Sequence, residues 1–188
     1  MKKQLKDICR IQPGIHIKSS EFEKGGKSIF IKLNDVPLGN VNTYKFTFTN
    51  FEVDDRFIIK EEDILFSTRI KFQAYHLPQH TKHPYIASSS FVILRPFYEI
   101  ILKDYLIWYL NLPNISNIIH KQNASGANMP FISIKNLKQL DVDLPPLNVQ
   151  KEIVKIHALQ MQERNLTQKI LSLKQTYLQS ILLNKVQQ

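Results

Sequence analysis

The stretch SGANMPFISIKNLKQLDVDLPPLNVQKEIVKI, residues 125–156, changes character at two adjacent prolines. Before them lie a small polar loop and a short apolar segment, and after Pro145 and Pro146 comes a run that contains neither proline nor glycine. Proline lacks an amide hydrogen and restricts the residue before it, so the pair ends a strand and stiffens the corner at which a helix begins. The stretch therefore predicts a domain and a long helix joined by a rigid corner.

The run from Asn148 to about Leu183 carries apolar residues at heptad spacing, with one polar break at Glu163. The seam consists of Ile156, Leu159, Leu166, Ile170, Leu173 and Tyr177. A helix of about 36 residues is about 54 Å long, which is longer than a compact domain of this size. We therefore expect a partner helix to cover the seam, as in a coiled coil. Packing of the helix along its own domain is the alternative.

The part of the chain before the prolines is expected to be rich in strands. Apolar and polar residues alternate in SIFIKL (28–33) and TYKFTFT (43–49), as in half-buried strands. RFIIKEEDILFSTRI (56–70) predicts two short strands around an acidic turn, and SSFVILRP (89–96) predicts a buried strand that proline ends.

From Glu99 onwards the apolar period becomes helical. EIILKDYLIWYLN predicts a helix, and NISNIIHKQ predicts a second helix after Pro113. Ser133 is the expected N-cap of a single helical turn, and LDVDL (140–144) the last strand. One helical face of EIILKDYLIWYLN carries Ile101, Tyr105, Trp108 and Tyr109.

These patterns together predict an α+β fold. A sheet-rich domain with packed helices would occupy residues 1–146, and one long coiled-coil helix residues 147–188. The composition agrees, because an apolar fraction of 43% with 11 Phe and 7 Tyr excludes a disordered chain. The single Cys9 cannot form an internal disulfide and is expected to be a small buried residue. No apolar run is long enough to span a membrane, and we expect a cytoplasmic protein.

The net charge of +9 is distributed unevenly along the chain. Between residues 64 and 140 the only carboxylates are those of Glu99 and Asp104. A surface with few carboxylates favours a polyanionic partner, although a protein that is merely basic remains the alternative. The basic residues of this window are Arg69, Lys71, Lys82, Arg95, Lys103, Lys121, Lys135 and Lys138.

The sequence lacks the motifs of several enzymes that act on DNA or nucleotides. DLPPLN has leucines where an adenine methyltransferase would place polar and aromatic residues, and no glycine-rich phosphate loop can be drawn. We expect no catalytic residue, no cofactor and no metal. A metal site at His76, His80 and His83 is disfavoured because no further ligand lies close by. A magnesium-dependent nuclease remains a rival hypothesis, with the candidates Asp54, Asp55, Glu61, Glu62 and Asp63.

Three stretches together carry a family resemblance: LKDICRIQPG (5–14), IKEEDILFSTRI (59–70) and the opening stretch, residues 125–156. In this combination the chain resembles the specificity subunit of Type I restriction-modification systems, whose half-unit is a target recognition domain followed by a helical spacer. The most specific match is LPPLNVQKEIV (144–154), which keeps the leucines, both prolines, the glutamine and the start of a helix in order.

The resemblance implies a non-catalytic subunit that recognises a specific sequence in double-stranded DNA. It also implies separate DNA methyltransferase (modification) subunits as partners and, in restriction complexes, a motor-nuclease subunit. The usual specificity subunit holds two recognition domains and two spacers, whereas this sequence holds one of each. We therefore expect a homodimer formed through the long helix. A truncated reading frame, a recombination cassette and a coiled-coil adaptor that binds only protein are the alternatives.

Basic and amide-bearing residues in loops at one end of the sheet are the expected DNA contacts. The candidates are Lys32, Asn34, Arg69, Lys71, Ser125 and Asn128, and the weaker choices are Lys18, Lys82, His83, Lys121 and Gln122. Ordinary solvated surface is the alternative for each of them.

Overall fold

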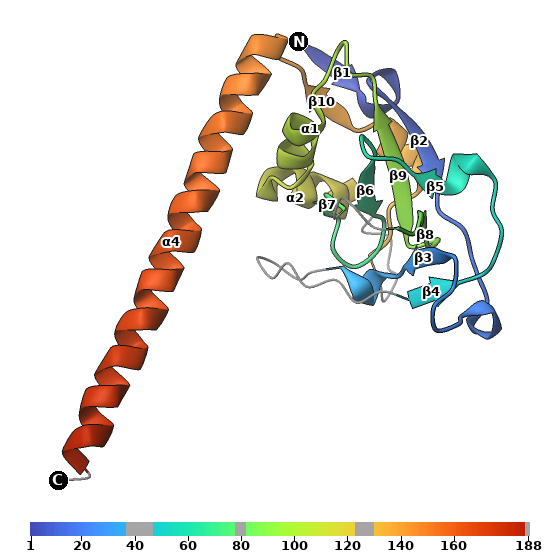
Figure 1. Cartoon of the computed structure of the whole chain (residues 1–188). Coiled ribbons are helices and arrows are strands. Elements are labelled where there is room, and N and C mark those ends of the chain that lie inside the picture. Colours follow the sequence, from blue (N-terminus) through green and yellow to red (C-terminus); the bar gives the residue numbers. More distant parts are fainter. Residues whose placement is uncertain (37–46, 78–81, 123–129, 187–188) are drawn as a thin grey trace. The chain divides into compact units, whose positions relative to one another are not determined.

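The computed structural model describes residues 1–36, 47–77, 82–122 and 130–186. The chain divides into two compact units, Met1–Gln150 (unit 1) and Lys151–Gln188 (unit 2). All the described strands and three short α-helices belong to unit 1, and most of the long helix α4 (Leu147–Val186) forms unit 2. The predicted α+β class with a long C-terminal helix is confirmed (Figure 1).

The first strand of unit 1 pairs with its last. In this two-stranded sheet β1 (Lys2–Gln4) runs antiparallel to β10 (Asp141–Asp143), and the two lie side by side in Figure 1. The amide of Leu5 donates to the carbonyl of Leu140 over 2.9 Å, and the amide of Leu144 donates to the carbonyl of Met1 over 2.7 Å. Residues near the start of the chain therefore hold the segment that precedes the proline pair.

One four-stranded sheet forms the centre of unit 1. Its order is β2 (Cys9–Pro13), β9 (Phe91–Pro96), β6 (Ile64–Ser67) and β7 (Ala74–Tyr75), and every neighbouring pair is antiparallel. All four residues of β6 are buried, as are the first four of β9. Side chains on both faces of a strand are buried only when other elements cover both faces of its sheet.

A second four-stranded sheet covers one face of the first. Its order is β4 (Thr47–Thr49), β3 (Ser28–Ile31), β8 (Tyr85–Ala87) and β5 (Ile58–Ile59). The pair β3 and β8 is parallel, and the other two pairs are antiparallel. The two sheets share one buried apolar cluster, which contains Ile29, Ile31, Val36, Ile59, Leu65, Tyr75, Tyr85, Ala87, Phe91 and Ile93.

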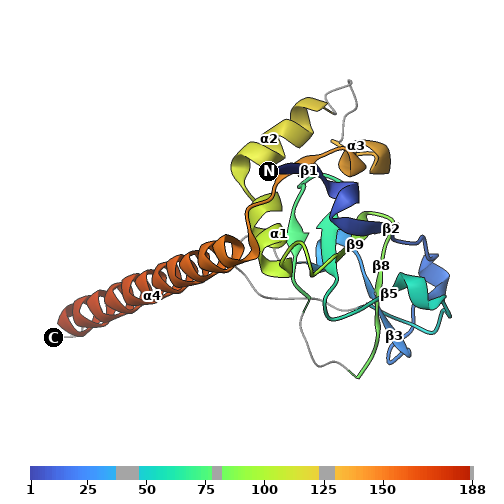
Figure 2. The same cartoon turned by 90° about the horizontal axis from the view of Figure 1, so that it is seen from above.

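Helices lie on the side of the central sheet away from β3 (Figure 2). They are α1 (Lys103–Leu110), α2 (Pro113–Gln122) and α3 (Ile134–Lys138). Four short 3-10 turns complete the described elements, at Leu5–Asp7, Ser19–Glu21, Leu33–Asp35 and Asp55–Phe57. The predicted N-cap is confirmed, because the Oγ of Ser133 accepts a hydrogen bond of 3.1 Å from the amide of Asn136.

Two details differ from the sequence-based expectations. The two strands predicted in residues 56–70 are present, but β5 pairs with β8 and β6 pairs with β9, so they belong to different sheets. Helix α1 begins only at Lys103, so Ile101 lies outside it, and Trp108 is only half-buried. Ile107 is buried instead, because α1 is covered on most of its circumference, which an amphipathic pattern does not reveal.

The edge strand β7 is protected by a side chain. The amide of Asn111, the residue after α1, accepts a hydrogen bond from the backbone N–H of Ala74 over 2.8 Å and donates to the carbonyl of the same residue over 2.9 Å. Asn111 thus occupies the place of a neighbouring strand. Exposed strand edges recruit other chains, so this contact closes a site of unwanted pairing.

The first turn of α4 is held inside unit 1 by Gln150, which has no exposed surface. Its Oε1 accepts a hydrogen bond of 2.9 Å from the amide of Leu102, and its Nε2 donates to the carbonyls of Ile100 (3.1 Å) and Pro145 (2.8 Å). Three partly buried backbone groups of two loops therefore depend on one side chain.

Replacing Gln150 with Leu is expected to lower the free energy of unfolding by about 2–4 kcal/mol, because three partly buried backbone groups lose their partner while the side-chain volume changes little. Urea denaturation of the full chain measures this. The matched control is Gln168→Leu on the exposed part of α4, which should change stability by less than about 0.5 kcal/mol. Equal effects of the two substitutions would contradict the assigned role of Gln150.

Candidate nucleic-acid interface

The turn that contains Ser88 and Ser90 joins β8 of one sheet to β9 of the other. The amide of Ser88 donates to the carbonyl of Ile31, at the end of β3, over 3.0 Å. The amide and the hydroxyl of Thr68, just after β6, both donate to the carbonyl of Ser90 over 2.9 Å. The C-terminal ends of β3 and β6 therefore meet at this turn, and so do the loops that follow them.

Gly14 packs against the same turn. Its amide donates to the carbonyl of Phe91 over 3.0 Å, and a Cβ at this position would lie 2.2 Å from the carbonyl oxygen of Ser88 and 2.7 Å from that of Ala87. Only glycine allows so close an approach of two backbone segments. This close packing explains why the stretch LKDICRIQPG ends in glycine.

Lys32 and Asn34 lie in the loop after β3. The amide of Lys32 donates to the Oδ2 of Asp35 over 2.9 Å, and the amide of Asp35 donates back to the carbonyl of Lys32 over 3.0 Å. The Nζ of Lys32 lies 5.2 Å from the centre of the Phe22 ring, within range of a cation–π interaction. Asn34 is exposed, whereas Asp35 is buried, so the carboxylate is turned away from solvent.

Arg69 and Lys71 lie in the loop after β6, and both are exposed. The guanidinium carbon of Arg69 is 5.4 Å from the centre of the Phe131 ring, and the two residues also pair as an isolated antiparallel bridge. The amide of Ile132 donates to the carbonyl of Thr68 over 3.0 Å. The segment after α2 thus runs along this loop and contributes an aromatic ring to it.

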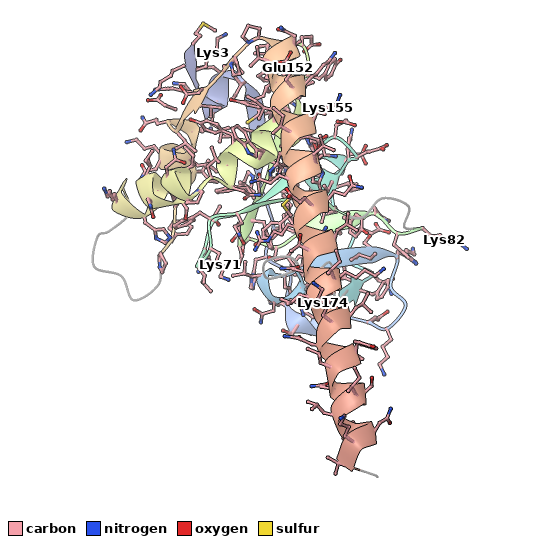
Figure 3. The ribbon with its side chains drawn as sticks, turned by 90° about the vertical axis from the view of Figure 1, so that its left-hand side faces the viewer. Lys3, Lys71, Lys82, Glu152, Lys155 and Lys174 are labelled. Carbon is pink, nitrogen blue, oxygen red and sulfur yellow. The ribbon has the colours of Figure 1, made fainter. Side chains whose placement is uncertain are left out.

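The remaining candidates lie elsewhere. His83 precedes β8, where its Nδ1 lies 3.1 Å from the carbonyl oxygen of Lys27, before β3. Because β3 and β8 are parallel, Lys82 and His83 are at the opposite end of β3 from Lys32. Figure 3 shows Lys71 and Lys82 on separate segments of unit 1.

Lys121 is exposed near the end of α2, where Gln122 is the last residue, and Lys18 precedes the turn Ser19–Glu21. Ser125 and Asn128 lie outside the described residues. The structure therefore gathers Lys32, Asn34, Arg69 and Lys71 at one end of the two sheets and does not bring Lys82 and His83 to them. That any of these residues contacts DNA remains a prediction.

The acidic turn before β6 is only partly solvated. Glu61 and Glu62 are exposed, but Asp63 is 5% exposed and accepts hydrogen bonds of 3.2 Å from the Nε of Arg95 with both carboxylate oxygens. The amide of Lys60 donates to the same carboxylate over 2.9 Å. The sequence gives no sign of this ion pair between a buried Asp63 and a partly exposed Arg95, because the two residues are 32 positions apart.

The Nη2 of Arg95 also donates to the carbonyls of Arg56 and Ile58, over 2.9 and 3.0 Å. Arg95 therefore joins the central sheet to β5 and to the 3-10 turn that precedes it. Asp63 balances its charge, so this carboxylate has a structural role in the described part of the chain.

The histidines do not form a metal centre in the described part of the chain, where no group of three or more potential ligands lies together. The Nε2 of His76 is 3.2 Å from the carboxylate of Asp104. Burial lowers the pKa of His76, and the nearby Asp104 partly opposes this change. His80 lies outside the described residues.

Cys9 is buried, as expected from the sequence. Its thiol donates to the carbonyl of Leu5 over 3.2 Å, and burial raises the pKa of Cys9 to about 12. A thiol with so high a pKa is a poor nucleophile at neutral pH.

The family of the chain is defined by comparison with known proteins. The family described as Type I restriction modification DNA specificity domain matches residues 1–174. The chain belongs to this family, which confirms the resemblance found in the sequence. No curated protein matches the chain. Within the described residues, no helix combines the length and the apolar character that crossing a membrane requires.

Solved structures with a similar fold include the HsdS subunit from Thermoanaerobacter tengcongensis, with a TM-score of 0.63 and 20% identity over 87% of this chain. A chain from a structure of the type I restriction-modification system, concerned with complex assembly and conformational transition, has a TM-score of 0.68 and 20% identity over 88%. The S subunit from M. genitalium has a TM-score of 0.59 and 14% identity over 85%. The present chain covers 37%, 39% and 38% of these three chains, so it spans about two fifths of their length.

Replacing Asp63 with Asn is expected to lower the free energy of unfolding by about 2–4 kcal/mol, because Arg95 loses its buried counter-charge. The loss should be the same with and without Mg²⁺ in urea denaturation. The control Glu62→Gln, on an exposed neighbour, should have an effect below about 0.5 kcal/mol. Stabilisation of the parent by Mg²⁺ that disappears in Asp63→Asn would instead identify a metal ligand.

Proposed function

We propose that the chain recognises a specific sequence in double-stranded DNA as part of a Type I restriction-modification system and performs no catalysis of its own. In this role it positions separate DNA methyltransferase subunits on the target and, in restriction complexes, a motor-nuclease subunit. The observation that carries the proposal is the match of residues 1–174 to the specificity-domain family. A cytoplasmic location follows from this role.

The end of unit 1 at which β3 and β6 terminate is the proposed DNA-binding surface. Lys32, Asn34, Arg69 and Lys71 supply two kinds of groups there. Cationic side chains bind phosphates and provide most of the affinity, whereas guanidinium and amide groups also recognise base edges. The nearby Asp35 is only 8% exposed, so it presents little negative charge to a phosphate.

Arg69→Ala is expected to weaken binding to a duplex selected by the full chain from a random-sequence pool. The loss should be about 1–3 kcal/mol if Arg69 contacts a base, or the salt dependence should decrease by about one unit if it contacts a phosphate. Fluorescence anisotropy at several salt concentrations separates the two cases.

The matched control for Arg69 is Arg56→Ala. Arg56 is also an exposed arginine, and its guanidinium carbon lies 4.8 Å from the centre of the Phe57 ring. Unchanged affinity and salt dependence in Arg69→Ala would remove Arg69 from the interface. Failure of the parent to enrich any sequence would count against DNA recognition itself and in favour of a protein-binding adaptor.

The exposed seam of α4 is the proposed site of dimerisation. A second copy of the chain, whose helix runs antiparallel, would cover this seam and hold two recognition domains at a fixed separation. Two such domains would recognise two half-sites with a constant gap. Between 53% and 67% of each residue's surface is exposed for Ile156, Leu159, Leu166, Ile170, Leu173 and Tyr177.

Leu166→Glu should convert the dimer into a monomer, because each copy would place a charge in the apolar seam. Light scattering coupled to size-exclusion chromatography measures the mass. The control Gln168→Glu changes a residue about 200° around the same helix and should leave the dimer intact. A Leu166→Glu protein that remains dimeric would exclude this seam as the interface.

The nuclease hypothesis is not supported. Of its candidate residues, Asp63 is buried against Arg95, and Asp54 lies 3.2 Å from Arg56.

A further inference from the structure

Ile70 has a backbone conformation that is rare for its side chain. Its φ is +63°, in the left-handed region that glycine adopts freely and that β-branched residues avoid. Among the described residues, no other non-glycine residue has a positive φ. The loop after β6 therefore has isoleucine at a position where glycine or asparagine would adopt the same φ with less conformational strain.

Three hydrogen bonds of Ile70 and its neighbours maintain this conformation. The amide of Lys71 donates to the carbonyl of Arg69 over 2.7 Å, which closes a γ-turn with Ile70 at its centre. The hydroxyl of Ser67 donates to the same carbonyl over 2.8 Å, and the amide of Ile70 donates to the carbonyl of Pro130 over 3.1 Å. Strain that the surrounding structure enforces in this way is found most often at binding and catalytic sites.

The strained turn displays an apolar side chain between cations. Ile70 is 45% exposed and Phe131 is 46% exposed, while Arg69 lies over the Phe131 ring and Lys71 follows in the chain. This charge pattern fits DNA, because cations on both sides can bind phosphates while the apolar tip approaches the bases.

The chemistry of isoleucine limits what it can recognise. Its side chain neither donates nor accepts hydrogen bonds, so it cannot read the polar groups of a base pair. The 5-methyl group of thymine is the apolar group that base pairs present in the major groove. Insertion between two base pairs is the other known use of an apolar side chain, and it would not depend on that methyl group.

We propose that Ile70 is a specificity-determining residue that contacts the 5-methyl group of a thymine in the major groove, and that Phe131 is a positioning residue that holds Arg69 beside it. The proposal rests on the function proposed above. It explains why the loop retains a β-branched residue at a positive φ, since glycine would relieve the strain but would lose the contact.

The test uses the full-length parent and the duplex that it selects from a random-sequence pool. Each thymine is replaced singly by deoxyuridine, which removes only the 5-methyl group. At least one replacement should weaken binding by the parent about 4-fold, the value expected for one buried methyl group. Ile70→Gly should bind the thymine duplex about as weakly as the parent binds the duplex with that replacement. The same replacement should not change the affinity of Ile70→Gly, whereas it should still weaken binding by Ile70→Val.

A loss of affinity in Ile70→Gly should not result from misfolding, because glycine adopts the required φ without strain. The melting temperature of Ile70→Gly should stay within about 4 °C of the parent's or rise. Phe131→Ala should also weaken binding, whereas the matched control Tyr98→Ala should not. Tyr98 is exposed and follows the opposite end of β9 from Ser90.

Two results would overturn the proposal: a selected site at which no thymine replacement affects the parent, or an Ile70→Gly protein that responds as the parent does. Either leaves DNA recognition by the chain intact. A parent that enriches no sequence would overturn both proposals.

Discussion

The buried amide of Gln150 is the interaction on which the junction between domain and helix depends. It lies at the first turn of α4, yet it satisfies backbone groups of Ile100 and Leu102, in the segment that leads into α1, and of Pro145. Backbone groups that are withdrawn from water need hydrogen-bond partners, and this amide provides them where the loop before α1 packs against the turn before α4. These hydrogen bonds give a physical explanation for the glutamine in LPPLNVQKEIV, which sequence similarity alone does not provide.

A second set of hydrogen bonds organises the opposite end of unit 1. The turn at Ser88 and Ser90 forms hydrogen bonds with the ends of both β3 and β6, and Gly14 packs closely against this turn. The loops that follow these two strands carry the cations of the proposed interface. Their position is therefore set by the central sheets and by backbone contacts, while the side chains that project from them can vary without disturbing the core.

Local patterns in the sequence predicted the local features of the fold. The strand in SIFIKL, the buried run in SSFVILRP, the N-cap at Ser133 and the uninterrupted α4 all follow from signals within a few residues, and all are present. The half-buried character expected of SIFIKL is wrong, because Phe30 is buried as well as Ile29 and Ile31. The pairing of β5 and β6 with different sheets has no such signal, because strand partners are chosen by packing over long distances.

The same reasoning explains which parts of the candidate site were found. Arg69 and Lys71 stood out by charge and position, and Phe131 could not be connected with them before the bridge between residues 69 and 131 was known. The positive φ of Ile70 could not be predicted either, since isoleucine normally indicates an extended strand with a negative φ.

The pairing of β1 with β10 has a consequence for how the protein is made. Lys3 faces Val142, so these partners are separated by most of unit 1 in the sequence. During synthesis on the ribosome the N-terminal strand must wait unpaired until residues 141–143 have emerged, and contacts of such long range slow folding. Unit 1 therefore cannot close until nearly all of it has been synthesised, and the closed unit also includes the first turn of α4, which supplies Gln150.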